Sequence, residues 1–474
     1  MREGIKKLLV IMLAVTMLLS FLSACASQNS ASTTNNADTT TNDTAENQAN
    51  NEPEDTQEPA DTADTNDSQD AAGGEKVTVT LLMSNTANRD GLNAVIEKME
   101  KDLNIATEVE LRPGGAEGEN ILRTRLAVGE STDIHLFNSG ALLGTLNPAK
   151  NFRELNDQPY IDKFDEAYKQ TVTFDGKIYG IPSSGTNAGG WLYNKKAYEE
   201  LGLSIPKTWD ELMENCEKIK AAGKTAVIGS FANDWTSQLI LLADYYNVQA
   251  EEPDFAEKFD RNEAKYHNTP AAFKAFEKMA EVYEKGFLNE DYNATTLEQA
   301  LKMLVDGDGI HYPMLTNQIQ NIETNHGREA ADNIGFFPQP GDDPDNVGVT
   351  IWIPDSFIFY KESPNIDACL KWAEYYVSDE AVELYASVIS PTGPYVIRGP
   401  QLPDNVYPAI KDMLQYFEAG KTAPALEFIT SVKAPNSPQI CIQALGGLKS
   451  PEECAKEYDD DVEKQAKQLG LEGW

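Results

Sequence analysis

Hydrophobic and polar positions along residues 76–341 alternate between two periods, and this alternation predicts an α/β protein. Runs with a period of two are typical of strands, and runs whose apolar positions recur every three or four residues are typical of helices. The predicted strands are 77–85, 106–113, 133–140, 178–182, 190–194, 225–230 and 333–341. The predicted helices are 91–103, 118–130, 207–223, 235–247 and 270–286, and 297–314 is predicted as helix, turn and strand. This order implies right-handed crossovers, and we predict two α/β units, each with a mainly parallel sheet flanked by helices.

A polar bridge interrupts the predicted core between the strands 178–182 and 190–194. It contains Ser, Gly, Thr and Asn. Two α/β units joined by such a bridge resemble two lobes around a cleft, so we interpret the bridge as a hinge. Ligands of parallel sheets bind beyond the carboxyl ends of the strands. The residues that this rule places at one rim of the cleft are Asn85, Thr86, Asn138 and Ser139.

The first 24 residues have the layout of a secretory signal peptide. Basic residues at positions 2, 6 and 7 precede an apolar run from 8 to 22, which is followed by small residues. The run is short for a membrane span. The tetrapeptide Leu-Ser-Ala-Cys that ends at Cys25 matches the bacterial lipobox, so we predict cleavage before Cys25 and a lipid on its sulfur. The alternative is an ordinary secreted protein with a free thiol near its new N-terminus.

Residues 26–75 form a tether in this interpretation. The segment is rich in Asn, Thr, Asp, Glu, Ala and Gln, and it contains no aromatic residue, Lys or Arg. Such a composition cannot bury enough apolar area to offset the entropy of ordering, which predicts disorder. A lipidated cysteine followed by an acidic tether suits a lipoprotein on the outer face of a Gram-positive cell membrane.

The charge and the cysteines exclude several classes of function. The formal net charge of −37 over 474 residues argues against nucleic-acid binding, which needs a basic face. The four histidines are scattered without ligand spacing and the cysteines form no C-x-x-C pair, so neither a metal site nor a cofactor is expected. Cys216 and Cys369 are expected in the core, while a disulfide between Cys441 and Cys454 is left open.

Several motifs resemble the extracellular solute-binding proteins of sugar-transporting ABC importers (family 1, maltose-binding-protein-like). The motifs are FDGKIYGIP (174–182), LYNKKAYEELGLSIPKTWDEL (192–212), ALKMLVDGDGIHYPM (300–314), IGFFPQPGDD (334–343), SPNIDACLKWAEYYVSDEAVELY (363–385) and LKSPEECAKEYDDDVEK (448–464). Their order and spacing extend over nearly all of residues 76–474. One departure is GDGIHYPM, where the family often has Gly-Lys-Ala-Ala-Met, and this leaves the nature of the ligand open.

The resemblance implies a two-lobed, Venus-flytrap fold that closes on a solute by hinge rotation and then presents it to a membrane permease. The first lobe would comprise residues 76–183 and about 348–394, and the second 184–347 and about 395–474. The chain would cross between the lobes near 182–186, 346–351 and 392–396. A monomer is expected.

A sugar site needs aromatic platforms and planar polar side chains that converge in a concave pocket. The residues for which we predict ligand contact are Trp235, Trp352, Asn187, Asn138, Ser139, Asp234, Asn85, Tyr312 and Trp191. Trp235 and Trp352 fall on different sides of the predicted crossings, so we expect them to stack on the ligand from opposite lobes. The alternative for each aromatic ring is burial in the core, and for each polar residue a turn at a strand end. Trp209 and Trp372 are better explained by helix packing.

Two other functions compete with sugar binding. A peptide or another small polar molecule is the alternative ligand. A surface-anchored glycoside hydrolase is the alternative class, but it needs paired carboxylates on opposing walls, and the acid pairs here lie in turns or on charged helix faces. No G-x-S-x-G, H-E-x-x-H or P-loop motif occurs. We therefore predict a binding protein, not an enzyme, that captures a carbohydrate, as an oligosaccharide, for an ABC permease.

Overall fold

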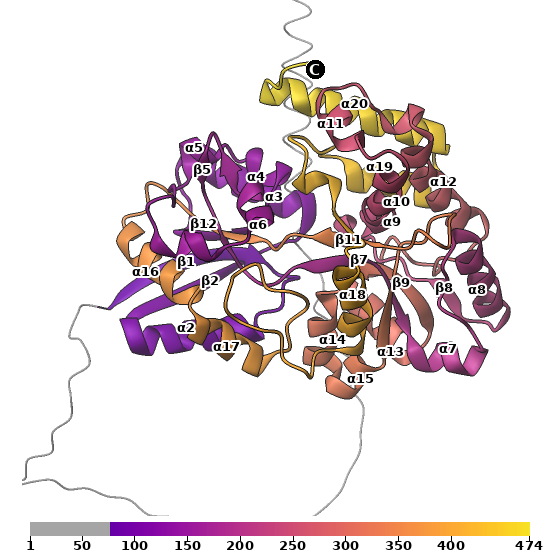
Figure 1. Cartoon of the computed structure of the whole chain (residues 1–474), viewed down its shortest axis with the longest axis horizontal. Helices are drawn as coiled ribbons and strands as arrows, with labels where there is room; N and C mark the ends of the chain where they lie inside the picture. The colour runs from indigo at the N-terminus through magenta and orange to yellow at the C-terminus, as the bar shows by residue number, and fades with distance from the viewer. Residues whose placement is uncertain (1–75) are drawn as a thin grey trace, which may run out of the picture. The chain divides into compact units, whose positions relative to one another are not determined.

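The computed structural model describes residues 76–474. The predicted signal peptide, the lipidation of Cys25 and the predicted tether lie outside the described residues. Within residues 76–474, α-helices and β-sheets are mixed along the chain, and two large sheets organise the fold (Figure 1).

The first sheet has five strands in the order β2-β1-β3-β12-β6. Their bounds are β1 Val77–Ser84, β2 Ile105–Arg112, β3 Ile134–Phe137, β12 Ser356–Phe359 and β6 Ile181–Pro182. β1 runs parallel to both β2 and β3, as the alternating pattern predicts, whereas β12 is antiparallel to both β3 and β6. The helices of this lobe are α2 Asp90–Leu103, α3 Gly115–Val128, α4 Ala141–Gly144, α5 Pro148–Asn151, η1 Pro159–Lys163, α6 Glu166–Thr171, α16 Ile366–Tyr376 and α17 Asp379–Val388, with the small hairpin β4 Thr173–Phe174 and β5 Lys177–Ile178.

The second sheet follows the order β13-β11-β7-β9-β8, and β10 also pairs with β7. Its strands are β7 Asn187–Asn194, β8 Thr225–Val227, β9 Gly309–Leu315, β10 Ile334–Pro338, β11 Val349–Trp352 and β13 Thr422–Pro424. The central strand β7 is antiparallel to β9, β10 and β11, so this sheet is mixed and not mainly parallel as the sequence predicted. Among the described strands of this sheet, only β8–β9 and β11–β13 form parallel pairs.

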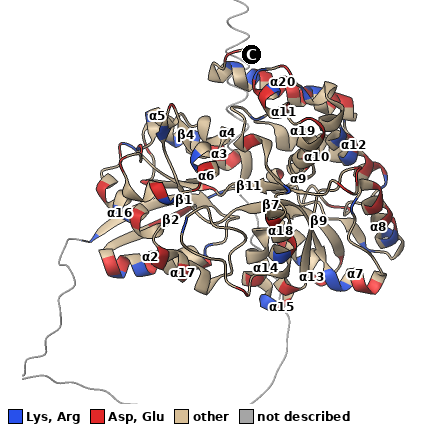
Figure 2. Cartoon of the chain, viewed as in Figure 1, with Lys and Arg blue, Asp and Glu red and all other residues tan. Residues whose placement is uncertain are grey.

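Helices surround the second sheet and form the larger lobe. They are α7 Lys195–Leu201, α8 Trp209–Ala221, η2 Asp234–Gln238, α9 Leu239–Ala243, α10 Tyr245–Glu251, α11 Phe255–Asp260, η3 Tyr266–Asn268, α12 Pro270–Glu284, α13 Leu297–Asp306, α14 Gln318–His326, α15 Arg328–Asp332, α18 Pro408–Glu418, η4 Leu426–Phe428, α19 Ser437–Leu445 and α20 Pro451–Leu469. The C-terminal helix α20 packs on α12 and α19, at the top of Figure 1. Figure 2 shows charged residues on the outer helices of both lobes and few on the central strands.

Local hydrogen bonds mark the start of α8, and the predicted helix 235–247 differs from the observed structure. The hydroxyl of Thr208 accepts a hydrogen bond from the Glu211 N–H and so caps the start of α8. The Glu211 carboxylate, however, accepts from the Lys207 N–H at 2.7 Å, one residue before the position that a capping box requires. The predicted helix 235–247 is split into η2, α9 and α10. Within η2, the Thr236 hydroxyl donates to the Ser230 carbonyl and the Ser237 hydroxyl donates to the Pro438 carbonyl.

The chain passes between the two sheets at three places. It leaves β6 and enters β7 through Ser183–Thr186, and it passes from β11 to β12 through Ile353–Asp355. The third passage, around Thr392–Val396, lies beside the first: the Thr186 N–H donates to the Pro394 carbonyl at 2.7 Å, and Gly185 forms a bridge with Tyr395. Short polar segments therefore connect the lobes, and two of them are hydrogen-bonded to each other.

Two other sequence questions are answered by the described residues. Cys441 and Cys454 are both buried and free, and so are Cys216 and Cys369. No helix within residues 76–474 is both long and apolar enough to span a bilayer.

Candidate functional site

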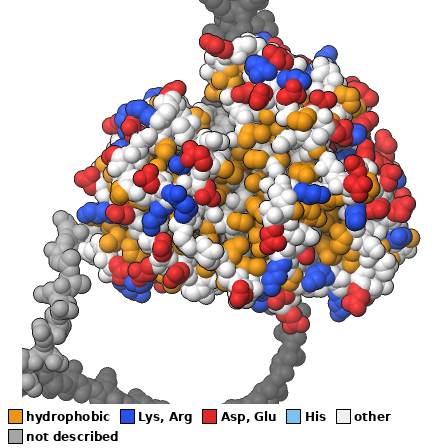
Figure 3. Space-filling model, in the orientation of Figure 1, with side chains coloured by type: hydrophobic (Ala, Val, Ile, Leu, Met, Phe, Trp, Pro, Cys, Tyr) orange, Lys and Arg blue, Asp and Glu red, His pale blue; other side chains and the backbone are white. Residues whose placement is uncertain are grey.

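A cleft lies where the polar loops of the first sheet face the second lobe. Its cavity measures about 250 Å³. The loops after β1, β2, β3 and β6 contribute to one wall, and η2, α9 and the start of α14 contribute to the other. This is the position that the strand-end rule predicts for a ligand of an α/β sheet. Figure 3 shows hydrophobic side chains gathered near the middle of one face and charged side chains around it.

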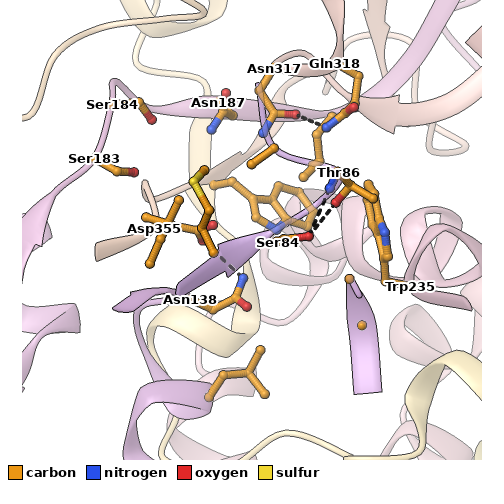
Figure 4. A pocket seen from close by; sticks show the side chains of 18 of the residues that line it. Ser84, Thr86, Asn138, Ser183, Ser184, Asn187, Trp235, Asn317, Gln318 and Asp355 are labelled. Carbon is orange, nitrogen blue, oxygen red and sulfur yellow. Dashed lines mark hydrogen bonds between the residues drawn. The ribbon is translucent and has the colours of Figure 1, made fainter. Parts of the chain in front are cut away.

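Short polar side chains from both lobes line this cleft (Figure 4). The labelled ones are Ser84, Thr86, Asn138, Ser183, Ser184, Asn187, Asn317, Gln318 and Asp355. Several are already fixed by hydrogen bonds to their neighbours. Asn138 Nδ2 donates to Asp355 Oδ1 at 3.2 Å, and the Thr392 hydroxyl donates to Asn187 Oδ1 at 2.9 Å. The cleft therefore presents oriented amides and hydroxyls.

Two tryptophans line the cleft. Trp352 ends β11 and packs over Gly189 of β7, where a Cβ atom would lie 2.1 Å from its ring; glycine therefore leaves the space that the ring occupies. Trp235 lies in η2 and is partly buried, with its Nε1 near Gly114 of the first lobe. Because β11 pairs with β7, Trp352 comes from the second sheet. Its ring, however, belongs to the core cluster of the first lobe, and stacking of the two rings on the ligand from opposite lobes stays a prediction.

The cleft also contains an arginine and an aspartate that form no ion pair with any residue in the described range 76–474. Arg112 ends β2 and is 6% exposed, and its terminal nitrogens donate to the Pro113 and Leu136 carbonyls. Asp355 lies between β11 and β12. Burial raises the pKa of the Asp355 carboxyl to about 6; Arg112 opposes this shift and Glu427 adds to it. Both side chains hold charge in a poorly solvated place, which is typical of functional sites.

Three buried polar atoms that line the cleft have no hydrogen-bond partner among the described residues: Arg112 Nε, Trp235 Nε1 and Gln238 Oε1. Gln238 ends η2 and is 8% exposed. Buried polar groups in proteins are nearly always hydrogen-bonded, and each one left unpaired costs about 1–3 kcal/mol. These three atoms belong to residues that line one cleft, which makes the three residues candidates for contact with a polar ligand.

The other predicted contact residues do not line the cleft. Trp191 is fully buried in the second lobe, where it stacks on Phe337 and donates to Gln339 Oε1 at 2.6 Å. Tyr312 is also buried, with its hydroxyl 2.6 Å from that of Ser230. Both belong to strands that are buried along nearly their whole length, β7 and β9.

The three polar candidates outside the lining have other surroundings. Ser139 donates to the Pro354 carbonyl at 2.7 Å behind the cleft wall. Asp234 accepts from Gln439 and lies against Gly115 at the start of α3. Asn85 is exposed. The structure thus brings Asn138, Asn187, Trp235 and Trp352 together in one cleft, and ligand contact by any of the predicted residues stays a prediction.

Direct hydrogen bonds join the lobes at one edge of the cleft. Asn88 Nδ2 donates to the Thr324 hydroxyl at 2.8 Å, and this hydroxyl donates to Asp90 Oδ2 at 2.5 Å. Asn321 Nδ2 donates to the Thr86 carbonyl at 3.1 Å. The β1–α2 loop of the first lobe therefore contacts α14 of the second without any ligand atom between them.

Sequence reasoning missed Arg112, Gln238 and Asp355. Arg112 ends a predicted strand, so the strand-end rule that selected Asn138 applied to it as well. Asp355 follows Trp352 closely in the sequence, so its place near a predicted ligand contact could have marked it as a cleft residue. No sequence signal marked Gln238 as a cleft residue, because it lay inside the continuous helix predicted over 235–247.

Comparisons with known proteins agree with this geometry. The sequence model of the family described as bacterial extracellular solute-binding protein matches residues 84–383. The multiple sugar-binding protein of Streptococcus mutans is 26% identical over 163 residues, which cover 34% of this chain and 38% of that protein. An uncharacterised ABC transporter extracellular-binding protein of Pyrococcus horikoshii is 23% identical over 52% of this chain and 55% of its own length. The chain thus matches about half or less of these curated relatives.

Solved structures share the fold over a larger part of the chain. A chitin oligosaccharide binding protein superposes with a TM-score of 0.71 and 21% identity, covering 82% of this chain and 99% of that one. The solute-binding protein RafE in complex with raffinose has a TM-score of 0.67 and 19% identity, covering 82% of this chain and 99% of that one. At this level of identity the likeness establishes the two-lobed fold.

Proposed function

This chain belongs to the bacterial extracellular solute-binding proteins, and we propose on this premise that it captures a carbohydrate, as an oligosaccharide, and delivers it to the permease of an ABC transporter. The observation that carries the proposal is the cleft itself. Two tryptophans and a set of amides and hydroxyls surround one cavity, and sugars need this combination of flat apolar faces and planar polar groups. Two similar proteins, a multiple sugar-binding protein and a chitin oligosaccharide binding protein, support the choice of ligand.

The proposed role is binding without reaction. Three carboxylates line the cleft, and two of them, Glu119 and Glu427, are paired with Arg123 and Lys433, so Asp355 is the one without an ion pair in residues 76–474. Glycoside hydrolysis needs an acid and a second carboxylate on either side of the scissile bond. The Glu119 carboxylate is held by Arg123 at 2.8 Å, so it does not form a free pair with Asp355 across a bond to be cleaved. A non-sugar solute remains the alternative ligand.

A ligand panel tests the proposal. Ligand that binds only the folded protein stabilises it, by about 2.7 kcal/mol at a hundredfold excess over Kd. We expect a rise in melting temperature with mono- or oligosaccharides, and none with peptides or polyamines. A rise with a peptide or polyamine and none with any sugar would replace the carbohydrate by that solute class.

Anchoring through Cys25 is part of the same proposal. The lipobox at Leu22–Cys25 supports a diacylglycerol thioether, with a palmitate-type lipid, on the outer face of a Gram-positive cell membrane. Cys25→Ser would then move the protein from the membrane fraction into the medium. Retention of the variant in the membrane fraction would contradict the lipid anchor but leave the ligand proposal standing.

A further inference from the structure

The polar atoms without partners in the cleft include both hydrogen-bond donors and hydrogen-bond acceptors. Arg112 Nε and Trp235 Nε1 are donors, and Gln238 Oε1 is an acceptor. Asp355 adds a second acceptor, because only its Oδ1 is hydrogen-bonded, to Asn138. A ligand that satisfies this set must therefore both accept and donate hydrogen bonds.

This balance discriminates among classes of ligand. A carboxylate or phosphate only accepts hydrogen bonds and would leave Gln238 and Asp355 unsatisfied, and an ammonium group only donates and would leave Arg112 and Trp235 unsatisfied. A sugar hydroxyl does both. The mixed set of cleft atoms is therefore suited to neighbouring hydroxyl groups on one ring.

The charges in the cleft lead to the same class. Of the charged side chains that line it, Glu119 pairs with Arg123, and Glu427 forms a buried pair with Lys433. Arg112 and Asp355 remain, and their charges are opposite. The lining therefore offers no net charge for an ionic ligand to neutralise, and a neutral ligand avoids the cost of burying another ion.

The space available limits the size of the ligand. The cavity of about 250 Å³ lies at the small end of small-molecule sites, which span about 300–1,000 Å³. The contacts of Asn88 and Asp90 with Thr324 close one edge. On another side, Asp234 and Trp235 of η2 lie against Gly114 and Gly115 at the start of α3.

We propose, resting on the proposed carbohydrate-binding function, that Arg112 and Gln238 are specificity-determining ligand contacts and that the ligand is a short neutral saccharide of one or two rings. Arg112 extends from β2 of the first lobe and Gln238 from η2 of the second. A ring whose hydroxyls bond to both side chains joins the lobes. Arg112 and Asp355 select hydroxyls over charged substituents, and Trp235 Nε1 donates to the same ring.

The test measures affinity of the full-length protein by calorimetric titration. The probes are glucose, galactose, maltose and lactose, their charged counterparts glucuronate, galacturonate and glucosamine, and the longer maltotetraose and raffinose. We expect at least one neutral mono- or disaccharide to bind about 10-fold tighter than its charged counterparts and than the longer sugars. A uronate, an amino sugar or a tetrasaccharide that bound tighter than every short neutral sugar would overturn the inference while carbohydrate binding stood.

Variants separate ligand contact from folding. Arg112→Lys keeps the charge but loses Nε, and Gln238→Leu removes the acceptor; each should weaken the best neutral sugar by about 10- to 100-fold. Gln443→Leu is the matched control, because Gln443 Oε1 is also buried and unpartnered but lies outside the cleft. We expect this control to bind as the unchanged protein does. Unchanged sugar affinity in both cleft variants would overturn the inference, and failure of every sugar to bind the unchanged protein would remove the proposed function as well.

Discussion

Trp352 and Trp235 differ in how firmly the protein itself holds them. Trp352 is 7% exposed and belongs to the core cluster of the first lobe, whereas Trp235 is only partly buried and packs against the cores of both lobes. A fully buried large apolar side chain contributes about 1.5–3 kcal/mol, and an aromatic contact adds about 0.5–1.5 kcal/mol. The two rings are therefore expected to respond differently to truncation.

We predict that Trp235→Ala and Trp352→Ala each weaken sugar binding by about 2–3 kcal/mol. Trp352→Ala should also lower the melting temperature, since loss of a buried tryptophan costs about 3–5 kcal/mol of stability, while Trp235→Ala should lower it less. Calorimetric titration combined with the thermal midpoint measures both effects. Near-normal binding by both variants would assign the rings to core packing.

Asp355 gives the cleft a dependence on pH. Burial raises the pKa of its carboxyl to about 6, against the opposing effect of Arg112 and with the support of Glu427. The carboxylate accepts hydrogen bonds from hydroxyls and the neutral acid does so less well, so sugar affinity should rise between pH 5 and 7. Because the folded-state pKa lies above that of the unfolded chain, ionisation in the folded state lowers stability as the pH rises through the interval from about 4 to 6.

Asp355→Asn is predicted to remove both effects. The variant should bind more weakly at pH 7 with a flatter pH profile, and its melting temperature relative to the unchanged protein should be higher at pH 7 than at pH 5. Titrations and thermal scans at the two pH values test this. An unchanged slope of affinity against pH in the variant would show that another group is responsible.

The sequence identified only some of these side chains because position along a strand does not determine burial. Asn138 was found by its place after a buried strand. Arg112 also lies at the end of a strand, but most positions of β2 are only partly buried or exposed. A charged side chain at the end of such a strand is expected to face solvent, so Arg112 was not predicted to line the cleft. The prediction of ligand contact for Trp191 has the opposite problem. Its strand β7 is buried on both faces, so an aromatic ring on this strand packs in the core.

At the scale of elements, the hydrophobic pattern of the sequence predicted where strands occur, but it did not predict how the strands pair. The predicted strands at 77–85, 106–113 and 133–140 correspond to β1, β2 and β3. The direction of β7 against β9, β10 and β11 depends on tertiary pairing between segments far apart in sequence, to which hydrophobic period is insensitive. The predicted helix 235–247 is also interrupted, and the first of its pieces is hydrogen-bonded to Ser230 and Pro438. Pro438 lies 201 residues further along the chain, so a local sequence pattern cannot reveal this contact.

The paired crossings make a prediction at this scale. A Cβ atom on Gly393 would lie 2.0 Å from the Thr186 carbonyl oxygen and 2.9 Å from Met413 Cε. A backbone oxygen cannot rotate away as the end of a flexible side chain can, so Gly393→Ala should force the two crossings apart. We expect a loss of about 1–3 kcal/mol in unfolding free energy, together with weaker ligand binding.

Denaturant unfolding and ligand titration of Gly393→Ala measure these losses. Gly144→Ala in α4 is the control, since its Cβ would approach only a flexible ring edge of Phe174 at 3.1 Å. A Gly393→Ala variant with the stability and affinity of the control would mean that the crossings have room to separate and that their contact is not needed for closure.

At the scale of the whole molecule, two lobes joined by short crossings are also held by contacts that involve no ligand. The Thr324 hydroxyl of α14 accepts from Asn88 and donates to Asp90, both of the first lobe. These hydrogen bonds exist only while the lobes are close, so they stabilise the closed form over an open one. The balance between the two forms is therefore expected to depend on Thr324 as well as on the ligand.

We predict that saturating sugar reduces the radius of gyration measured by small-angle scattering, because the ligand binds the closed form more tightly and shifts the population toward it. Thr324→Val keeps the shape of the side chain but removes both hydrogen bonds. At about 1 kcal/mol per hydrogen bond, the variant should populate the open form more without ligand, show a larger change in radius on binding, and bind about 5- to 30-fold more weakly. If neither protein changes its radius at saturating ligand, the lobes do not close on the ligand; if the variant alone changes, the unchanged protein is already closed without it, which these cross-lobe hydrogen bonds explain.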